Sequence, residues 1–120
     1  MANPFVHIEL NTSDLSKAKT FYRELLEWEL KDTDMGPGGT YTTIGVGEGT
    51  GGGMMKHPME GAPSLWIPYI LVDSVAVATK KARQLGATII KENVPVPNMG
   101  AFSLITDPTG ATFGLWEARK

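Results

Sequence analysis

The chain has 120 residues, of which 42% are hydrophobic and 20% are charged, and its formal net charge is -2 at pH 7. A chain of this size and composition is typical of one globular domain, which buries roughly two-thirds of its unfolded surface. The small negative charge offers no basic surface for nucleic acid or for an anionic membrane. The sequence has no cysteine, which excludes disulfides, thiolate metal ligands and cysteine nucleophiles.

Hydropathy gives an expectation about location. No apolar run approaches the ~20 residues needed to cross a bilayer. The first nine residues, MANPFVHIE, lack the basic and apolar regions of a secretory signal. We therefore expect a cytoplasmic protein with no membrane partner and no nucleic-acid partner.

The first half of the chain predicts a strand, a helix and three more strands. Residues 5–10 alternate in polarity, which predicts a strand with His7 and Glu9 on one face. Residues 11–14 carry short oxygen side chains that cap helices. The helix should run to about residue 27, with an apolar stripe made of Leu15, Ala18, Phe21, Tyr22, Leu25 and Leu26.

Three strands and a linker complete this half. Residues 28–33, 41–46 and 51–56 read as strands, and the Gly- and Pro-containing segment 34–39 reads as a loop. Residues 57–64, which begin with His57, form a plausible linker to the second half. We expect His57 to be exposed there.

The second half shows the same order. We expect a strand at 65–72, a helix at 74–85 closed by Gly86, a strand at 87–94, a loop at 95–98 and a hairpin of 101–106 with 111–117. The helix stripe consists of Val75, Ala78, Ala82 and Leu85. The Asp-Pro-Thr-Gly sequence at 107–110 suits the hairpin turn. The expected core face of the hairpin carries Phe102, Leu104, Phe113 and Leu115.

The two halves overlay as one βαβββ module used twice. Placing Asp14-Leu15 on Ser74-Val75 also places Ala18 on Ala78. Only two helices are available, which excludes a doubly wound parallel fold. The predicted fold class is α+β: two modules, at about 4–57 and 65–118, form a curled mixed sheet around a concave cavity with both helices outside.

This pattern resembles the vicinal oxygen chelate superfamily, the group of glyoxalases, bleomycin-resistance proteins and extradiol dioxygenases. The most specific parts are TSDLSKAKTFYRELLEW at 12–28 and DPTGATFGLWE at 107–117, and the resemblance covers nearly the whole chain. It implies one domain over residues 1–120. In that group, metal enzymes take their ligands from the first and last strands of each module. The resemblance therefore also implies where such ligands would lie in this chain.

The four implied ligand positions fall on His7, Ile67, Gly53 and Gly114. Only the first of these has a side chain that can bind a metal, and a divalent ion needs several charged or imidazole donors. The sequence therefore predicts a lost metal site and no cofactor.

A ligand pocket is predicted on the inward face of the strands. We expect it to be lined by His7, Glu9, Gly53, Met55, Ile67, Tyr69, Ser103, Gly114 and Trp116. His7, with Glu9 two residues away, is the best candidate for a general base, and the alternative is a strand histidine kept from a metal-binding ancestor. The two glycines suit close approach by a ligand, or a bend of the sheet.

Several functions stay open at this point. The leading prediction is a small-molecule-binding protein with a partly apolar or aromatic ligand, which is either a simple binder or a metal-independent enzyme. One alternative is a metal-dependent lyase or dioxygenase that uses Glu9, His57 or Glu117. Another alternative is a drug-sequestering resistance protein. Such proteins bind a cationic drug in an acidic groove, and Glu9 is the single acidic residue predicted to line the cavity here. A further alternative is an interaction domain with a filled cavity. Open sheet edges predict a homodimer.

Overall fold

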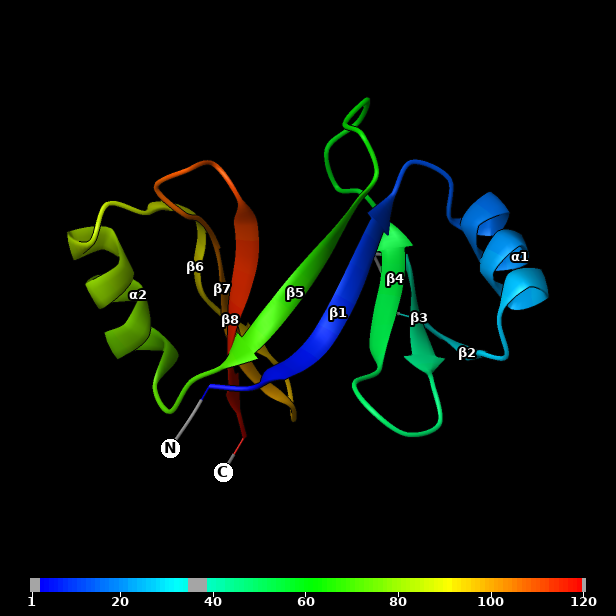
Figure 1. Ribbon diagram of the computed structural model, residues 1–120, viewed down its shortest axis with the longest axis horizontal. Coiled ribbons are helices and arrows are strands. Elements are labelled where there is room, and N and C mark those ends of the chain that lie inside the picture. Colours follow the sequence, from blue (N-terminus) through cyan, green and yellow to red (C-terminus); the bar gives the residue numbers. More distant parts are fainter. Residues whose placement is uncertain (1–2, 35–38, 120) are drawn as a thin grey trace. The chain divides into compact units, whose positions relative to one another are not determined.

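The computed structural model describes residues 3–34 and 39–119. Its elements follow the predicted βαβββ order twice (Figure 1). In chain order they are β1 (Phe5–Thr12), α1 (Leu15–Leu25), β2 (Glu29–Asp34), β3 (Thr40–Gly45), β4 (Gly52–Lys56), β5 (Leu65–Leu71), α2 (Val75–Gln84), β6 (Thr88–Val96), β7 (Gly100–Thr106) and β8 (Thr112–Ala118). Of the loop predicted at 34–39, residues 35–38 lie outside the described residues.

The chain divides into two compact units. We call His7–Ile67 the N-terminal unit, and Pro68–Lys120 together with Met1–Val6 the C-terminal unit. The strand order is β2-β3-β4-β1 in the N-terminal unit and β5-β8-β7-β6 in the C-terminal unit. In each unit the first strand pairs in parallel with the last, and the other pairs are antiparallel. The α+β class with mixed strand pairing is therefore confirmed.

Matching pairs of residues confirm the repeat. In the parallel pairs, Glu9 is the register partner of Gly53, and Tyr69 is the register partner of Gly114. The helices also begin alike, because the side chains at the two N-caps each accept a hydrogen bond from a backbone N–H three residues later. These caps are Asp14, which accepts from Lys17, and Ser74, which accepts from Val77.

Two local turns form as the sequence predicts. Gly86 follows α2 with a φ of +100°, a conformation that suits glycine, and the Ala87 N–H closes the helix on the Ala82 carbonyl at 3.0 Å. In the β7–β8 turn, Asp107 Oδ1 accepts from the Thr109 hydroxyl at 2.7 Å and from the Ala111 N–H at 3.0 Å. These bonds lower the pKa of the Asp107 carboxyl, with the Thr109 hydroxyl contributing most.

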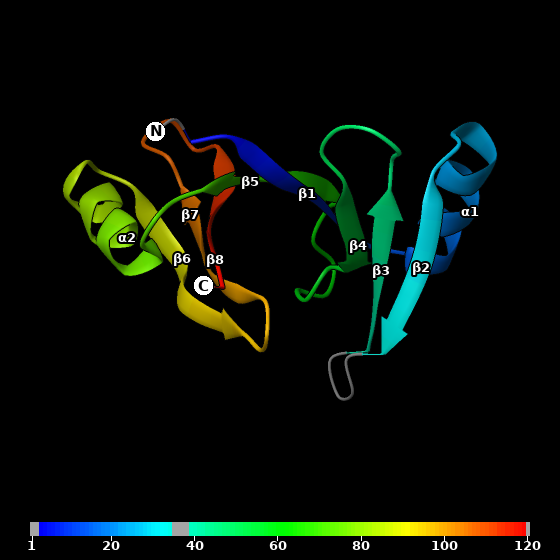
Figure 2. The same ribbon diagram turned by 90° about the horizontal axis from the view of Figure 1, so that it is seen from below.

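The core of the N-terminal unit lies between its sheet and α1. Figure 2 shows this helix beside the strands of the unit. The buried members of this core are Leu10, Ile44 and Met54, and α1 packs on them through Leu15, Ala18 and Tyr22. The predicted stripe on α1 was too wide: Phe21 and Leu25 are 57% and 61% exposed. Both residues lie at one edge of the stripe at 100° per residue, so only its centre meets the sheet.

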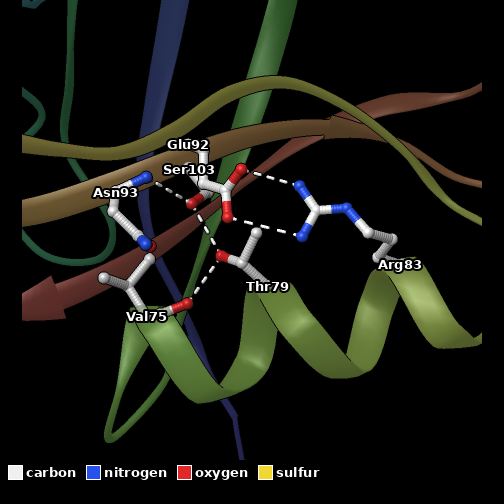
Figure 3. Close-up of polar contacts among 6 residues, drawn as sticks. All are labelled: Val75, Thr79, Arg83, Glu92, Asn93 and Ser103. Carbon is white, nitrogen blue, oxygen red and sulfur yellow. Dashed lines mark hydrogen bonds and ion pairs between the residues drawn. The ribbon is translucent and has the colours of Figure 1, made fainter.

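The core of the C-terminal unit lies between α2 and its sheet, and Val75, Ile105 and Leu115 are its buried apolar members. It also contains a polar chain, shown in Figure 3. The Asn93 N–H donates to the Ser103 hydroxyl at 3.0 Å, and that hydroxyl lies 2.7 Å from Thr79 Oγ1. Thr79 in turn donates to the Val75 carbonyl at 2.5 Å, so the buried hydroxyls are satisfied.

The predicted faces of β7 were therefore wrong. Ser103 pairs with Leu115 and faces α2, whereas Phe102 pairs with Trp116 and Leu104 with Gly114 on the opposite face. The physical reason is the five-residue connection 107–111, which closes on the Thr106–Thr112 pair and sets this register. Ser103 is wholly buried on the helix side and is not beside Gly114.

Two smaller predictions also need correction. Leu85 is 68% exposed, so it does not extend the α2 stripe into the core. Residues 95–96 belong to β6 rather than to the predicted loop. A proline is tolerated there because β6 is the last strand in its sheet order, where a missing N–H costs no ladder bond. Among the described residues, neither helix is long and apolar enough to cross a membrane.

Candidate functional site

The face of the N-terminal sheet opposite α1 carries a row of polar side chains. Strand alternation puts Leu10 of β1 in the α1 core and His7, Glu9 and Asn11 on the other face. Tyr41 of β3 joins them: its hydroxyl lies 2.7 Å from His7 Nε2 and donates to Glu9 Oε1 at 3.0 Å. Asn11 Nδ2 donates to Glu9 Oε2 at 2.9 Å. We call these four residues the polar row.

Burial favours the neutral form of the histidine in this row. The pKa of His7 is lowered from its ordinary value of 6.5, because burial disfavours the charged imidazolium. The carboxylate of Glu9 opposes this effect and raises the pKa, but burial is the stronger of the two. His7 is therefore a neutral imidazole at pH 7, which is the form that can accept a proton.

Gly53 of β4 leaves the space that the ring of Tyr41 occupies. A Cβ atom added at Gly53 would lie 2.1 Å from the Tyr41 hydroxyl oxygen and 2.3 Å from Cζ, so any side chain there would displace the ring. Met55 lies on the same face as Gly53 by strand alternation and is the register partner of Asn11. The glycine thus marks a close approach, by an aromatic ring of the chain itself.

The C-terminal unit repeats this arrangement with different chemistry. A Cβ at Gly114 would lie 2.2 Å from the Tyr69 ring carbons Cδ2 and Cε2. The Tyr69 ring meets the edge of Phe102, with centroids 5.9 Å apart. Trp116 is on the same face and lies over Gly100, where an added Cβ would be 2.9 Å from indole Cζ2. This face of the unit is aromatic.

The structure groups most of the predicted pocket residues, unit by unit. His7, Glu9, Gly53 and Met55 share the face of the N-terminal sheet opposite α1, and Tyr69, Gly114 and Trp116 share the corresponding face of the C-terminal sheet. Ile67 is 3% exposed, and Ser103 lies on the helix side of its sheet.

Two members of the polar row were missed from the sequence. Asn11 was read only as part of a helix cap, and Tyr41 only as part of a strand. The alternation of Tyr41, Thr42 and Thr43 carried a signal, because it puts Tyr41 on the face of β3 that Gly53 shares. The hydroxyl contacts themselves depend on strand order, which no local pattern reveals.

The donor set does not fit a metal ion. Gly53 and Gly114 have tyrosine rings where a ligand side chain would stand, and Ile67 is a hydrocarbon. The alternative ligands have other tasks: Glu117 Oε1 accepts the Val75 N–H of α2 at 2.8 Å, and His57 Nδ1 accepts the Met59 N–H at 3.0 Å. Across residues 3–34 and 39–119, no group of three or more His, Cys, Asp or Glu side chains could hold a metal.

A separate apolar pocket of about 200 Å³ lies in the N-terminal unit. It is lined by Ile8, Trp28, Ile44, Val46, Thr50, Gly51, Gly52 and Trp66. Strand alternation puts Ile8 and Ile44 on the α1 side of the sheet, so this pocket does not open onto the polar row. It holds no titratable side chain, and we therefore place the candidate site at the polar row.

Comparison with known sequences identifies the family. A sequence model described as the Glyoxalase/Bleomycin resistance protein/Dioxygenase superfamily matches residues 5–115. The chain belongs to this superfamily. The resemblance seen in its motifs is thereby confirmed.

Known relatives agree with this assignment. The chain is 36% identical over 117 residues to the proteins named "Putative glyoxylase CFP32" from Mycobacterium bovis and Mycobacterium tuberculosis. The match covers 94% of this chain but 45% of those proteins, so the chain spans about half the length of these curated relatives.

Solved structures share the fold at low sequence identity. A hypothetical protein from Bacillus halodurans C-125 has a TM-score of 0.76 at 17% identity, covering 100% of this chain and 97% of its own. Methylmalonyl-CoA epimerase from Mycobacterium tuberculosis has a TM-score of 0.71 at 16% identity, covering 97% and 88%. The enzyme from Streptomyces coelicolor, solved with 2-nitronate-propionyl-CoA, has a TM-score of 0.73 at 13% identity, covering 97% of both chains.

The donor set predicts weak metal binding. Purified protein should carry well under one equivalent of zinc, nickel, iron or manganese by elemental analysis. Adding these ions should barely raise the melting temperature, because only a ligand bound to the folded state stabilises it by mass action. One tightly held metal per chain, lost in His7→Ala, would contradict this reading of the site.

The lowered pKa of His7 predicts a pH effect with a definite sign. The unfolded chain binds the proton more readily, so the stability that His7 contributes is present above pH 6.5 and is lost as the pH falls through its folded pKa. Histidine NMR should titrate His7 below 6.5. Glu9→Gln should lower the midpoint further, because Glu9 raises it, whereas Glu24→Gln on α1 should not. A His7 midpoint above 6.5 is the contrary result.

Proposed function

We propose that this protein binds a small organic molecule at the polar row, through hydrogen bonds and apolar contacts rather than through a metal ion. The observation that supports this most is the hydrogen-bonded set of His7, Tyr41 and Glu9, which lies on a sheet face where the described residues form no metal donor set. Hydrogen-bonding groups in a partly buried site orient a ligand, while neighbouring apolar groups supply most of its burial.

The surroundings of the row favour a ligand with an apolar or aromatic part. Tyr41 and Met55 lie beside His7 and Glu9 on the N-terminal sheet. Aromatic and thioether side chains pack well against flat or irregular apolar groups. A contribution of Ile67, Tyr69, Gly114 and Trp116 to ligand binding stays a prediction.

The same geometry suits proton transfer. A neutral imidazole near a carboxylate can take a proton from a bound molecule, and general base catalysis of this kind contributes typically 10²- to 10⁴-fold. A protein with the same fold binds a small organic molecule, since methylmalonyl-CoA epimerase from Streptomyces coelicolor was solved in complex with 2-nitronate-propionyl-CoA. We propose binding as the basic function and a metal-independent proton transfer as the chemistry that this site would perform.

The proposal predicts ligands that perturb His7 selectively. The chain has two histidines, so His57 is a reference within the same molecule. In a library of small aromatic and carbonyl compounds screened by histidine NMR, some should shift the His7 ring signals and leave those of His57 in place. For these compounds, calorimetry should show at least a tenfold loss of affinity in His7→Ala, equivalent to about 1.4 kcal/mol.

The matched control for this experiment is His57→Ala, which should bind the same compounds as the natural protein does. Library compounds that bind His7→Ala and the natural protein equally well would remove His7 from the site. A library without any binder at millimolar concentration would contradict the proposal itself.

We also propose a homodimer. Two features support it: β2 and β6 end the strand orders of their units, and α1 exposes Phe21 and Leu25. Exposed strand edges and apolar side chains are commonly covered by a second copy of the chain. Light scattering should give twice the chain mass at high protein concentration, and a monomer mass under those conditions would oppose the idea.

A further inference from the structure

Tyr41 occupies the centre of the polar row. Its hydroxyl contacts both His7 Nε2 and Glu9 Oε1, at 2.7 and 3.0 Å, and its ring lies close to the His7 ring, with centroids 6.4 Å apart and planes 19° apart. It is the one member of the row that comes from β3 rather than from β1.

The number of protons on these groups decides which atom donates and which accepts in each hydrogen bond. The hydroxyl of Tyr41 has a single proton, which it donates to Glu9 Oε1. The phenol oxygen must then accept from His7, which places the imidazole proton on Nε2. Asn11 donates a hydrogen bond to the second carboxylate oxygen of Glu9. Donation therefore runs from His7 to Tyr41 to Glu9.

The place of the tyrosine depends on Gly53. An added Cβ at this position would lie 2.1 Å from the hydroxyl oxygen, far inside contact distance. The C-terminal unit gives an independent case, because Gly114 leaves the same kind of space for the ring of Tyr69. In both units a glycine in the last strand stands under a tyrosine ring.

We propose that Tyr41 is the positioning residue of this site. Its ring packs on Gly53, and its hydroxyl fixes His7 as the Nε2–H tautomer, which makes Nδ1 the basic nitrogen. The proposal rests on the proposed function, because it gives His7 its task there. It also predicts that a carboxylate introduced at position 53 does not by itself rebuild a metal site, since the tyrosine ring fills the space.

The first test reads the tautomer directly. Nitrogen chemical shifts of labelled histidine, measured above the His7 pKa, should show His7 protonated on Nε2 in the natural protein. Tyr41→Phe keeps the ring over Gly53 but removes the hydroxyl. The fraction of the Nδ1–H form should then rise roughly fivefold, the effect of losing one net hydrogen bond. His57 signals should not change. An unchanged His7 tautomer in Tyr41→Phe would overturn the proposal.

The second test measures whether the packing of the Tyr41 ring depends on the absence of a side chain at Gly53. Gly53→Ala should lower the urea midpoint in the natural background, because the new methyl group displaces the tyrosine. It should have a smaller effect in a Tyr41→Ala background, where the ring is gone. Such coupling between two neighbouring residues is what a double-mutant cycle measures. Equal loss of stability in both backgrounds would show that Tyr41 is not seated on Gly53.

The outcomes separate this inference from the proposed function. If the tautomer changes in Tyr41→Phe and no library compound binds the natural protein, the positioning role stands and the proposed function fails. If a compound binds the natural protein and Tyr41→Phe equally, with the tautomer unchanged, the proposed function stands and the positioning role fails.

Discussion

The close approach of a tyrosine ring to a glycine in the last strand is the constraint on which the candidate site depends. At Gly53 and at Gly114 an added Cβ would fall within 2.2 Å of ring or hydroxyl atoms. Protein interiors do not absorb such overlaps, because they are packed as densely as organic crystals. Each glycine thus decides which side chain occupies its face of the sheet. At Gly53 that side chain is Tyr41, which joins His7 to Glu9.

Similar contacts hold the helix on the sheet in the two units. In each, an ion pair joins the helix to the strand at the sheet edge: Lys19 with Asp32 at 2.7 Å, and Arg83 with Glu92 at 2.6 Å (Figure 3 shows the second). Exposed pairs of this kind contribute little to stability, because water and salt screen the two charges. The helices are therefore held chiefly by apolar packing, and in the C-terminal unit also by the buried hydroxyl chain through Ser103.

Membership of the superfamily does not define the chemistry of this chain. The three solved structures described above, with TM-scores of 0.71 to 0.76, are 13 to 17% identical to it, so they establish the fold alone. The residues at the implied metal positions give more information. One histidine, one isoleucine and two glycines cannot supply the several donors that a divalent ion needs. The chemistry that we propose for these residues is hydrogen bonding and proton transfer by His7, with Glu9 and Tyr41 as its partners.

The sequence by itself determined the repeat and most of its local structure, because caps, turns and hydrophobic periodicity depend on neighbouring residues. Asp14, Gly86 and Asp107 all act as their local patterns predict. The tertiary structure decided the faces and partners. Ser103 was predicted on the wrong face because the register of β7 on β8 is set by how the five-residue connection closes. Tyr41 was missed because its contacts with His7 and Glu9 join strands separated by about thirty residues, a pairing that only the order of strands in the sheet can bring about.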